Sequence, residues 1–556
     1  MSMSHHATAL SPSSHQDTFA RDHLPPADQW PVFLFDTPEV QYPEQLNATL
    51  ELVDHHVANG KGERIALYGE NANGSYSWTY QQLHNKINQI ANVLTHDMGL
   101  VSGNRLLLRG GNSPMMAACL LATMKAGLVA VPTMPLLRAS ELATILEKGR
   151  ISAALCDSLL AQELEHCMTA GHAHHVPALQ QMVQFRSAAA DGLEQRMDQH
   201  TGEFSAHPTS QDDVCLIAFT SGTTGKPKGT MHFHRDVLAM CDLFPRHVLK
   251  MTENDVVCGT PPIAFTFGLG GLLAFALRHA ASTVLIEKHT PQSLLDTISK
   301  YQATQCYTAP TFYRQMAALA SQVNLRSLKH AVSAGEALPD ATRQLWKKAT
   351  GQEITDGIGG TEMIHIYISS GGDKVRAGSI GQVVPGYTAR IVDDDMQPVP
   401  PGTVGRLAVR GPTGCKYLDD PRQQDYVKAG WNLPGDTFVM DADGYFSYQA
   451  RNDDMIISAG YNIAGPEVED ALLQHPAVAE CAVVGVQDED RGQIVQAFVV
   501  LKAGFHGNET MTLELQEHVK KSIAPFKYPR NVVFMDNLPR TETGKLQRFR
   551  LRQISS

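Results

Sequence analysis

The stretch Thr220–Gly229 carries the residue types and spacing best suited to chemistry. It reads Thr-Ser-Gly-Thr-Thr-Gly-Lys-Pro-Lys-Gly and follows an apolar run, Val214–Phe219, that predicts a buried strand. A glycine-rich loop at a strand end offers bare backbone N–H groups, hydroxyl donors and positive charge to a polyanion. It is not the P-loop of nucleotide triphosphatases, because no Ser or Thr follows the lysine at that spacing.

Further segments of similar character follow the loop. They are Pro261–Gly270, Ser333–Glu336, Asp356–Glu362, Gly435–Asp436, Arg451–Asp454, Gly460–Asn462 and Pro539–Lys545. In this order, and with the pattern S-G-T-T-G-x-P-K-G, they resemble the signature motifs of the adenylate-forming superfamily, which includes acyl-CoA synthetases, adenylation domains and luciferases. The resemblance spans nearly the whole chain. It implies activation of a carboxylic acid with ATP, Mg²⁺ and coenzyme A.

The chemistry of such an activation explains the residue types. A carboxylate is a poor acyl donor because its leaving group would be oxide. Attack of the carboxylate on the α-phosphate of ATP forms an acyl-adenylate and releases pyrophosphate, and a thiol then displaces AMP. Because the first step brings two anions together, catalysis must rest mainly on positioning and electrostatic stabilisation.

The resemblance implies three catalytic residues. Lys545 would bridge the carboxylate and the α-phosphate, Thr361 would contact the α-phosphate, and Glu362 would bind Mg²⁺. One glutamate suffices, because Mg²⁺ typically takes few protein carboxylates and keeps several waters. The alternatives are a solvated terminal lysine and a surface glutamate that caps a helix.

The resemblance also implies a nucleotide site built from four segments. Asp356, Gly357 and Ile358, together with Ser333–Glu336, would flank the adenine; Ile358 stands where many relatives carry an aromatic ring, so stacking becomes aliphatic packing. Asp436 and Arg451 resemble the ribose-binding pair, although an ordinary ion pair is the alternative. The glycine-rich loop and Ser333–Glu336 contribute Thr220, Ser221, Gly222, Thr223, Thr224, Gly225, Lys228, Ser333, Ala334, Gly335 and Glu336.

A second half-reaction would follow rotation of a small C-terminal domain about Asp453. By resemblance, Lys545 then leaves, and Gly460 and Tyr461 arrive to line a pantetheine channel, so one active site serves both steps. The coenzyme A nucleotide would meet residues for stacking and phosphate pairing. These are Phe526, Lys527 and Arg530, for which plain surface residues are the alternative.

The activated acid is predicted to be aromatic. The stretch Asp356–Ile366 closely resembles benzoate-type CoA ligases, and Phe19–Pro31 with Phe265–Gly270 resembles the 2-aminobenzoate branch. Matching positions around the acyl group form a short flat slot: Thr266, Phe267, Ala309, Gly359, His365 and Ile366. Phe267 falls where benzoate enzymes carry a tyrosine. Either His365 accepts a hydrogen bond from an ortho amine, or it is a wall histidine whose hydrogen bonds are satisfied.

Three rival functions stay open. A carrier-protein adenylating module usually has an Asp near the second motif, where this chain has Ala264–Thr266, and no carrier domain is expected after Ser556. A short- or medium-chain fatty acyl-CoA synthetase is the closest competitor. A non-catalytic nucleotide sensor would not need the intact Lys545, Glu362 and Asp436.

Composition excludes several classes of partner. The 556 residues are 43% hydrophobic and 19% charged, with 46 Lys and Arg against 57 Asp and Glu, a net charge of −11. This excess of acid argues against nucleic acid, and no apolar run approaches the roughly 20 residues of a membrane span. The nine cysteines form no C-x-x-C pair, and no signal peptide is evident, which predicts a reduced, cytoplasmic monomer or homodimer.

The elements that must hold these residues alternate between strand and helix. This alternation predicts an α/β fold with parallel sheets, and the resemblance implies two αβ subdomains plus a β-rich subdomain. The expected boundaries are an N-terminal domain at 1–450, a hinge at 451–453 and a small mobile α+β lid at 454–556, whose end from Glu517 to Arg552 is strongly basic. Ser187–Asp212 is predicted to be a surface connection and the first dozen residues to be disordered.

Overall fold

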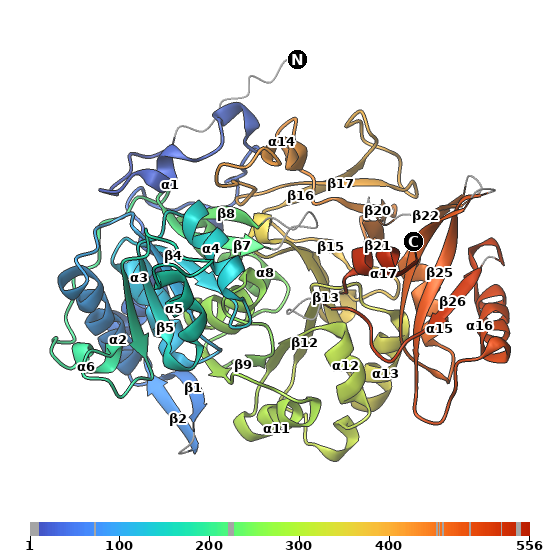
Figure 1. Ribbon diagram of the computed structural model, residues 1–556, viewed down its shortest axis with the longest axis horizontal. Helices are drawn as coiled ribbons and strands as arrows, with labels where there is room; N and C mark the ends of the chain where they lie inside the picture. The colour runs from blue at the N-terminus through green and yellow to red at the C-terminus, as the bar shows by residue number, and fades with distance from the viewer. Residues whose placement is uncertain are drawn as a thin grey trace.

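The computed structural model contains four sheets in a large body and a smaller C-terminal unit (Figure 1). It describes residues 10–71, 74–220, 227–451, 454, 456–458, 461–488, 491–523, 525–540 and 546–555. The expected α/β architecture is confirmed: two sheets carry helices, a third is β-rich, and the C-terminal unit has its own sheet. None of the described helices is long and apolar enough to cross a membrane.

The first αβ sheet has the order β6-β5-β3-β4-β7-β8 and is parallel except for the antiparallel pair β7–β8. The pair β7–β8 lies at one edge of this sheet. Its strands are β3 (Arg105–Arg109), β4 (Val129–Thr133), β5 (Ala153–Asp157), β6 (Gln181–Phe185), β7 (Val214–Thr220) and β8 (Lys228–Phe233). The helices of this region are α1 (Phe19–Asp22), α2 (Tyr80–Asn92), α3 (Pro114–Lys125), α4 (Ala139–Lys148), α5 (Gln162–Met168) and α6 (Leu193–Met197).

The second sheet has the order β15-β14-β13-β12-β11-β9-β10-β1-β2, and its central strands β13 to β1 are parallel. Its strands are β1 (Ile65–Asn71), β2 (Gly74–Thr79), β9 (Val256–Gly259), β10 (Ser282–Leu285), β11 (Gln305–Thr308), β12 (His330–Ala334), β13 (Ile354–Gly359), β14 (Ile366–Ser369) and β15 (Gln382–Val383). The accompanying helices are α7 (His234–Asp242), α8 (Phe244–His247), α9 (Thr266–Leu269), α10 (Phe275–Arg278), α11 (Pro291–Tyr301), α12 (Pro310–Ala317) and α13 (Asp340–Thr350).

The strands of the β-rich sheet come before residue 453 in the sequence, and those of the C-terminal sheet come after it. The former has the order β18-β19-β17-β20-β21, with β16 on β17, and the latter β23-β22-β25-β24, with β26 on β25. The β-rich elements are β16 (Thr388–Val392), β17 (Gly405–Arg410), α14 (Gln423–Tyr426), β18 (Val427–Lys428), β19 (Trp431–Asn432), β20 (Asp436–Met440) and β21 (Phe446–Arg451). The C-terminal elements are β22 (Ile456–Ser458), β23 (Tyr461–Ile463), α15 (Gly465–Leu473), β24 (Val478–Asp488), β25 (Gly492–Leu501), α16 (Glu509–Ser522), β26 (Asn531–Phe534) and α17 (Arg548–Ser555).

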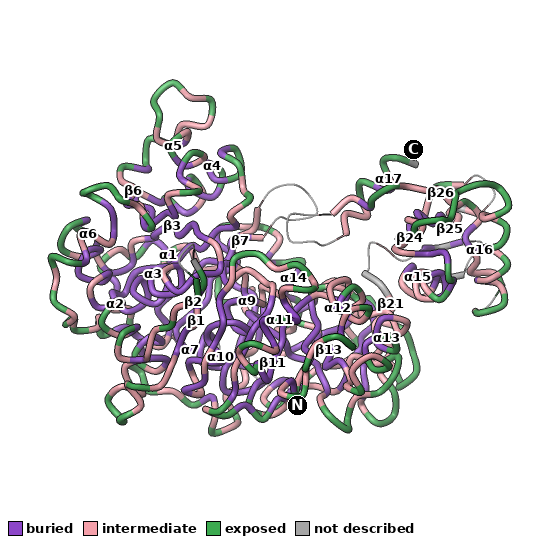
Figure 2. Tube along the Cα trace, turned by 90° about the horizontal axis from the view of Figure 1, so that it is seen from below, coloured by how far each residue is buried: buried purple, intermediate pink, exposed green. Residues whose placement is uncertain are grey.

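The core lies between the first two sheets, where Figure 2 shows mostly buried chain. Every side chain of α3 except Met115 is buried, so this helix is apolar on all sides. Its one charged residue, Lys125, pairs with Asp54 at the helix end. Lys125 therefore has a structural role at the end of this helix.

Two segments are packed more tightly than the sequence predicted. In the N-terminal segment, Ser11, Ser13 and Ser14 donate hydrogen bonds to the carboxylates of Asp212 and Asp213, so residues 10–15 are ordered against the first sheet. The Ser187–Asp212 connection includes α6, whose apolar side chains are buried, and ends in buried polar residues. Polar composition misled the prediction because carboxylates satisfy these hydroxyl groups in place of water.

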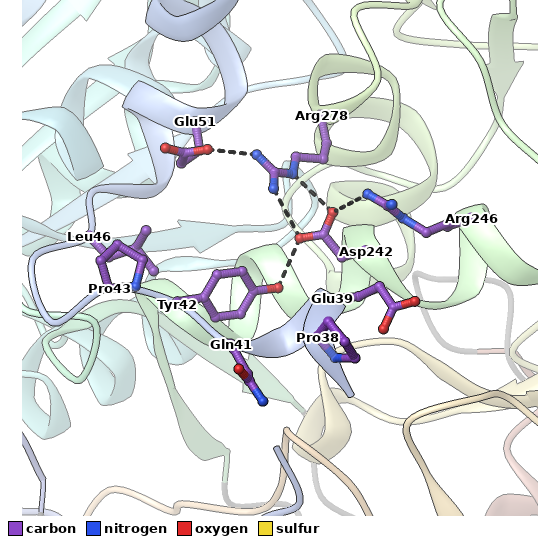
Figure 3. Close-up of a pocket in the computed structure, with 10 residues that line it drawn as sticks. All are labelled: Pro38, Glu39, Gln41, Tyr42, Pro43, Leu46, Glu51, Asp242, Arg246 and Arg278. Atoms are coloured by element: carbon purple, nitrogen blue, oxygen red, sulfur yellow. Dashed lines mark hydrogen bonds and ion pairs between the residues drawn. The ribbon is translucent and has the colours of Figure 1, made fainter. Parts of the chain in front are cut away.

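A pocket of about 320 Å³ is lined by an ionic network around the buried Asp242 of α7 (Figure 3). Asp242 accepts hydrogen bonds from Tyr42, Arg246 and Arg278, and Arg278 also pairs with Glu51 at 2.8 Å. Tyr42 and Glu51 come from the N-terminal segment, whereas Arg278 belongs to α10. The charged groups of the network neutralise one another. Because they come from different parts of the chain, the network joins the N-terminal segment to the second αβ layer.

The C-terminal unit contacts the large body through helix α13. Asp470 of α15 accepts a hydrogen bond from the backbone N–H of Ala341, in the first turn of α13, at 3.2 Å. Helix α13 has no side-chain cap of its own, because Pro339 occupies the N-cap position. Arg540 adds a second link, because its guanidinium pairs with Glu336 of the large body and Glu480 of β24.

Candidate active site

The predicted adenine residues lie together at the carboxyl ends of neighbouring parallel strands. The register pairs Ser333 of β12 with Asp356 of β13, and Ala334 with Gly357. Gly335 follows with φ +90°, which turns the chain toward Glu336. In open α/β sheets, ligands bind in the crevice outside these strand ends.

Two polar groups at this edge have no hydrogen-bond partner among the described residues. They are the hydroxyl of Ser333 and Oδ1 of Asp356, and both are buried. Burial raises the pKa of Asp356 to about 7, although the Arg343 guanidinium opposes this shift. Buried polar groups are normally satisfied, so these two atoms are suited to the donors and acceptors of a ligand.

Glu362 is held by a tyrosine that the motifs did not single out. The hydroxyl of Tyr417 donates to Oε1 of Glu362 at 2.5 Å and accepts from Nζ of Lys228 at 3.1 Å. Lys228 is the first residue of β8, directly after the glycine-rich loop, whereas Glu362 lies in the 3₁₀ turn Thr361–Met363. Burial, with the Glu362 carboxylate beside it, raises the pKa of Tyr417 well above its usual value, so the hydroxyl keeps its proton.

The surroundings of Glu362 fit a magnesium ion that arrives with nucleotide. Over the described residues, no group of three or more His, Cys, Asp or Glu side chains is arranged to hold a metal. Mg²⁺ is usually bound by one or two carboxylates together with substrate phosphates and waters. Glu362, half-buried beside Thr361, would be such a ligand, and the ion would neutralise phosphate charge.

The backbone between Glu362 and the substrate wall is strained. Ile364 adopts φ 65° and ψ −37°, a conformation that is an outlier for a β-branched residue. Its N–H donates to the carbonyl of Thr361, and Thr413 donates to the carbonyl of Met363 at 2.9 Å. Such strain clusters at functional sites, where surrounding contacts impose it.

Aromatic rings surround His365. The ring centroids of Phe275, Phe267 and Phe244 lie 4.5, 5.7 and 5.8 Å from the imidazole, and Tyr307 packs edge-on against Phe267. Nε2 of His365 lies 3.3 Å from the carbonyl oxygen of Phe267, which assigns the proton to Nε2. Nδ1 is then an acceptor, and it has no partner among the described residues.

Burial makes His365 neutral and leaves it little space. Burial lowers the pKa of His365 to about 3. A Cβ on Gly270 would lie 2.5 Å from His365 Cδ2, and a Cβ on Gly359 would lie 2.5 Å from the His365 carbonyl oxygen. Both glycines therefore allow the wall to close around this histidine.

The other predicted acyl-site residues differ in burial. Thr266 and Ile366 are buried, Phe267 and Ala309 are half-buried, and Gly359 is exposed. Phe267 and His365 are in direct contact, and Ile366 pairs with Gly359 across β13 and β14. Phe267, Ala309 and Gly359 are thus the more exposed of the predicted acyl-site residues.

The predicted ribose pair lies on adjacent strands. The register of β20 and β21 places Asp436 opposite Arg451. The backbone of Arg451 is described, but its side chain is not. The pairing of these two residues with a ribose stays a prediction.

Several predicted residues lie outside the described part of the chain. They are Ser221, Gly222, Thr223, Thr224, Gly225, Asp453, Gly460 and Lys545. Tyr461 belongs to β23, although its side chain is not described. On either side of the Lys545 segment, Arg540 and Leu546 form an antiparallel bridge, and Arg540 is paired with Glu336 of the adenine motif.

The residues proposed for the coenzyme A nucleotide already have protein partners. Lys527 pairs with both carboxylate oxygens of Glu467 at 2.6 Å. The Arg530 guanidinium lies over the Tyr528 ring at 4.8 Å, and Phe526 packs against the C-terminal core. A phosphate would have to compete with Glu467 for Lys527, so this part of the site stays a prediction.

The fold and site define a family. Residues 54–416 match the model of the AMP-binding enzyme family, and residues 467–545 match that of the AMP-binding enzyme C-terminal domain. The chain therefore belongs to this family of adenylate-forming enzymes. It is an AMP-forming acid–CoA ligase that uses ATP, Mg²⁺ and coenzyme A.

Three similar proteins are CoA ligases or acyl-CoA synthetases. The chain is 35% identical over 522 residues to the benzoate–CoA ligase of Thauera aromatica, covering 93% of this chain and 97% of that protein. The structure of the anthranilate CoA ligase AuaEII with anthranoyl-AMP is similar at TM-score 0.87 and 32% identity, over 94% of this chain and 99% of that one. The human mitochondrial acyl-coenzyme A synthetase ACSM5 is 33% identical, covering 88% and 86%.

Proposed function

We propose that the protein converts an aromatic carboxylate of the benzoate class, with 2-aminobenzoate favoured, to its coenzyme A thioester in the cytoplasm. The observation that carries this proposal is the aromatic wall around a neutral His365 whose Nδ1 has no partner among the described residues. AMP and pyrophosphate are the other products. The free state of all nine cysteines supports a reducing compartment.

The wall favours a ring over an alkyl chain. Phe267, Phe275 and Tyr307 present edges and faces to one another, and aromatic pairs in such arrangements gain about 0.5–1.5 kcal/mol beyond their area burial. The anthranilate and benzoate ligases among the relatives agree with this choice. The acyl-coenzyme A synthetases among them keep fatty acids as the competing substrate class.

The unpaired Nδ1 atom favours an ortho amine. An unsatisfied buried acceptor costs about 1–3 kcal/mol, and an amine donor on the bound ring would remove that cost. Reaching this nitrogen requires the side chains that cover it to move, because Nδ1 is buried in the free protein. A site built to hydrogen-bond its substrate discriminates strongly against an analogue without the donor.

The substitution His365→Phe tests this choice, because it keeps a ring and removes the acceptor. For the unsubstituted protein we expect kcat/KM for 2-aminobenzoate to exceed that for benzoate by about 10- to 100-fold, the equivalent of one such hydrogen bond. In His365→Phe the ratio should fall toward one. Phe275→Leu, which thins the wall without removing an acceptor, should slow both acids alike. An unchanged ratio in His365→Phe would eliminate the role of Nδ1.

The remaining predicted residues act in the two half-reactions. Lys545 stabilises the transition state of adenylation. Thr361 contacts the α-phosphate, and Glu362 binds Mg²⁺. The chain pivots at Asp453, between residues 1–450 and residues 454–556. Rotation then brings Gly460 and the coenzyme A residues to the acyl-adenylate. The link from Arg540 to Glu336 supports this order, because it joins the segment before Lys545 to the adenine motif.

A further inference from the structure

Three elements meet at the hydroxyl group of Tyr417. Lys228 donates to it from the end of the glycine-rich loop, and it donates to Glu362 in the turn after β13. The Lys228 ammonium also lies 5.0 Å from the centre of the Tyr417 ring. Among the described residues, Tyr417 is the only hydrogen-bond donor to the Glu362 side chain.

The direction of these hydrogen bonds is fixed by chemistry. An ammonium group can only donate and a carboxylate can only accept, so a hydroxyl between them accepts from one and donates to the other. Hydrogen bonds to charged groups are the stronger ones. The Tyr417 hydroxyl therefore fixes one oxygen of Glu362 and leaves the other, Oε2, for a ligand.

The backbone around Tyr417 keeps the hydroxyl in place. Residues 416–418 extend the edge of β8, because Met231 N–H donates to the Lys416 carbonyl and Leu418 N–H donates to the Gly229 carbonyl. Gln423 accepts the N–H of Tyr417 at 3.0 Å. The ring itself is fully buried. The position of the hydroxyl is thus set by the same strand that carries Lys228.

We propose that Tyr417 is a positioning residue for the magnesium–phosphate site. It orients Glu362 toward the metal and holds Lys228 at the base of the phosphate loop, so that carboxylate and ammonium are placed together. Partners that orient a metal ligand typically contribute 10–100-fold in metal affinity or activity. The inference rests on the family's use of ATP and Mg²⁺ and not on the identity of the acid.

The test compares two buried tyrosines. Tyr417→Phe removes the hydroxyl and keeps the ring, whereas Tyr426→Phe makes the same change in a ring 5.9 Å away that has no described hydrogen bond to Glu362. With Mn²⁺ as a paramagnetic stand-in for Mg²⁺, electron paramagnetic resonance measures the metal held by the protein–ATP complex. We expect Tyr417→Phe to retain Mn²⁺ about 10-fold more weakly and Tyr426→Phe to match the unsubstituted protein.

The kinetic readout separates positioning from packing. In Tyr417→Phe the KM for Mg²⁺ should rise while the KM for the aromatic acid stays the same. Tyr417→Met, which fills the space without a hydroxyl, should show the same Mn²⁺ loss and replaces the Phe variant if that variant does not fold. An unchanged Mn²⁺ affinity, or an equal loss in Tyr426→Phe, would overturn the inference. Because no acid is present in the metal measurement, an error in the proposed substrate would leave its result intact.

Discussion

Asp356 couples the stability of the fold to pH, because its carboxyl is buried and Oδ1 has no hydrogen-bond partner among the described residues. Its pKa in the folded chain is about 7, against an ordinary value of 3.8. The folded state therefore holds this proton more tightly than the unfolded chain. The resulting stabilisation is present below about pH 4 and is lost as the pH rises through about 7.

Asp356→Asn removes this titration and keeps the side-chain shape. The difference in melting temperature, variant minus unsubstituted protein, should become more positive between about pH 5 and about pH 8. Differential scanning calorimetry at several pH values measures it. A difference that stays constant across this range, or that becomes more negative, would show that Asp356 is ionised in the fold.

The sequence motifs named residues that the fold brings close together. The fold places Phe267 and His365 in direct contact, whereas the roles assigned to these two residues and to Glu362 stay predictions. Tyr417 could not be found in this way, because its partners lie 55 and 189 positions away in the chain. Only the folded sheet brings its hydroxyl between Lys228 and Glu362.

At the scale of elements, Arg540 joins two domains at the adenine motif. Its guanidinium contacts Glu336 at 3.1 Å and Glu480 at 2.9 Å. We expect Arg540→Ala to slow acid-dependent pyrophosphate exchange about 10-fold, the equivalent of one hydrogen bond to a charged group, and to affect thioester formation from supplied acyl-adenylate much less. Glu480→Gln, which alters only the contact within the C-terminal unit, should have a smaller effect. Equal slowing of both half-reactions by Arg540→Ala would contradict this role.

The alternation of apolar strands and amphipathic helices predicted the elements near the site. The apolar residues of Thr304–Tyr307 predict a strand, which the structure has at Gln305–Thr308, and the pattern of Gln292–Tyr301 predicts a helix, which the structure has at Pro291–Tyr301. Helix α16 begins at Glu509, because the side chain of Asn508 caps it by accepting the N–H of Met511. The buried part of the 187–212 connection was missed because its polar groups find protein partners.

At the scale of the whole molecule, the two proposed half-reactions require two conformations of one active site. Lys545→Ala should lower the rate of adenylation by ~10²–10³, by analogy with the loss of one preorganised transition-state donor. The same variant should still form thioester from supplied acyl-adenylate and coenzyme A. Single-turnover measurements of each half-reaction provide the comparison. Equal losses in both would rule out the alternation.

The thiol channel gives an independent test of the second conformation. Gly460→Leu, which would fill that channel, should spare pyrophosphate release and block transfer to coenzyme A. Stopped-flow detection of pyrophosphate and chromatography of the thioester separate the two effects. If pyrophosphate release were blocked as strongly, the channel would have to lie elsewhere.

The central claim is that this chain activates an aromatic carboxylate through an adenylate. The most direct measurement is the exchange of labelled pyrophosphate into ATP, without coenzyme A, for 2-aminobenzoate, benzoate, hydroxybenzoates and short fatty acids. The account predicts exchange that depends on an aromatic acid and is fastest with 2-aminobenzoate. Exchange that is faster with a fatty acid than with every aromatic acid would contradict it.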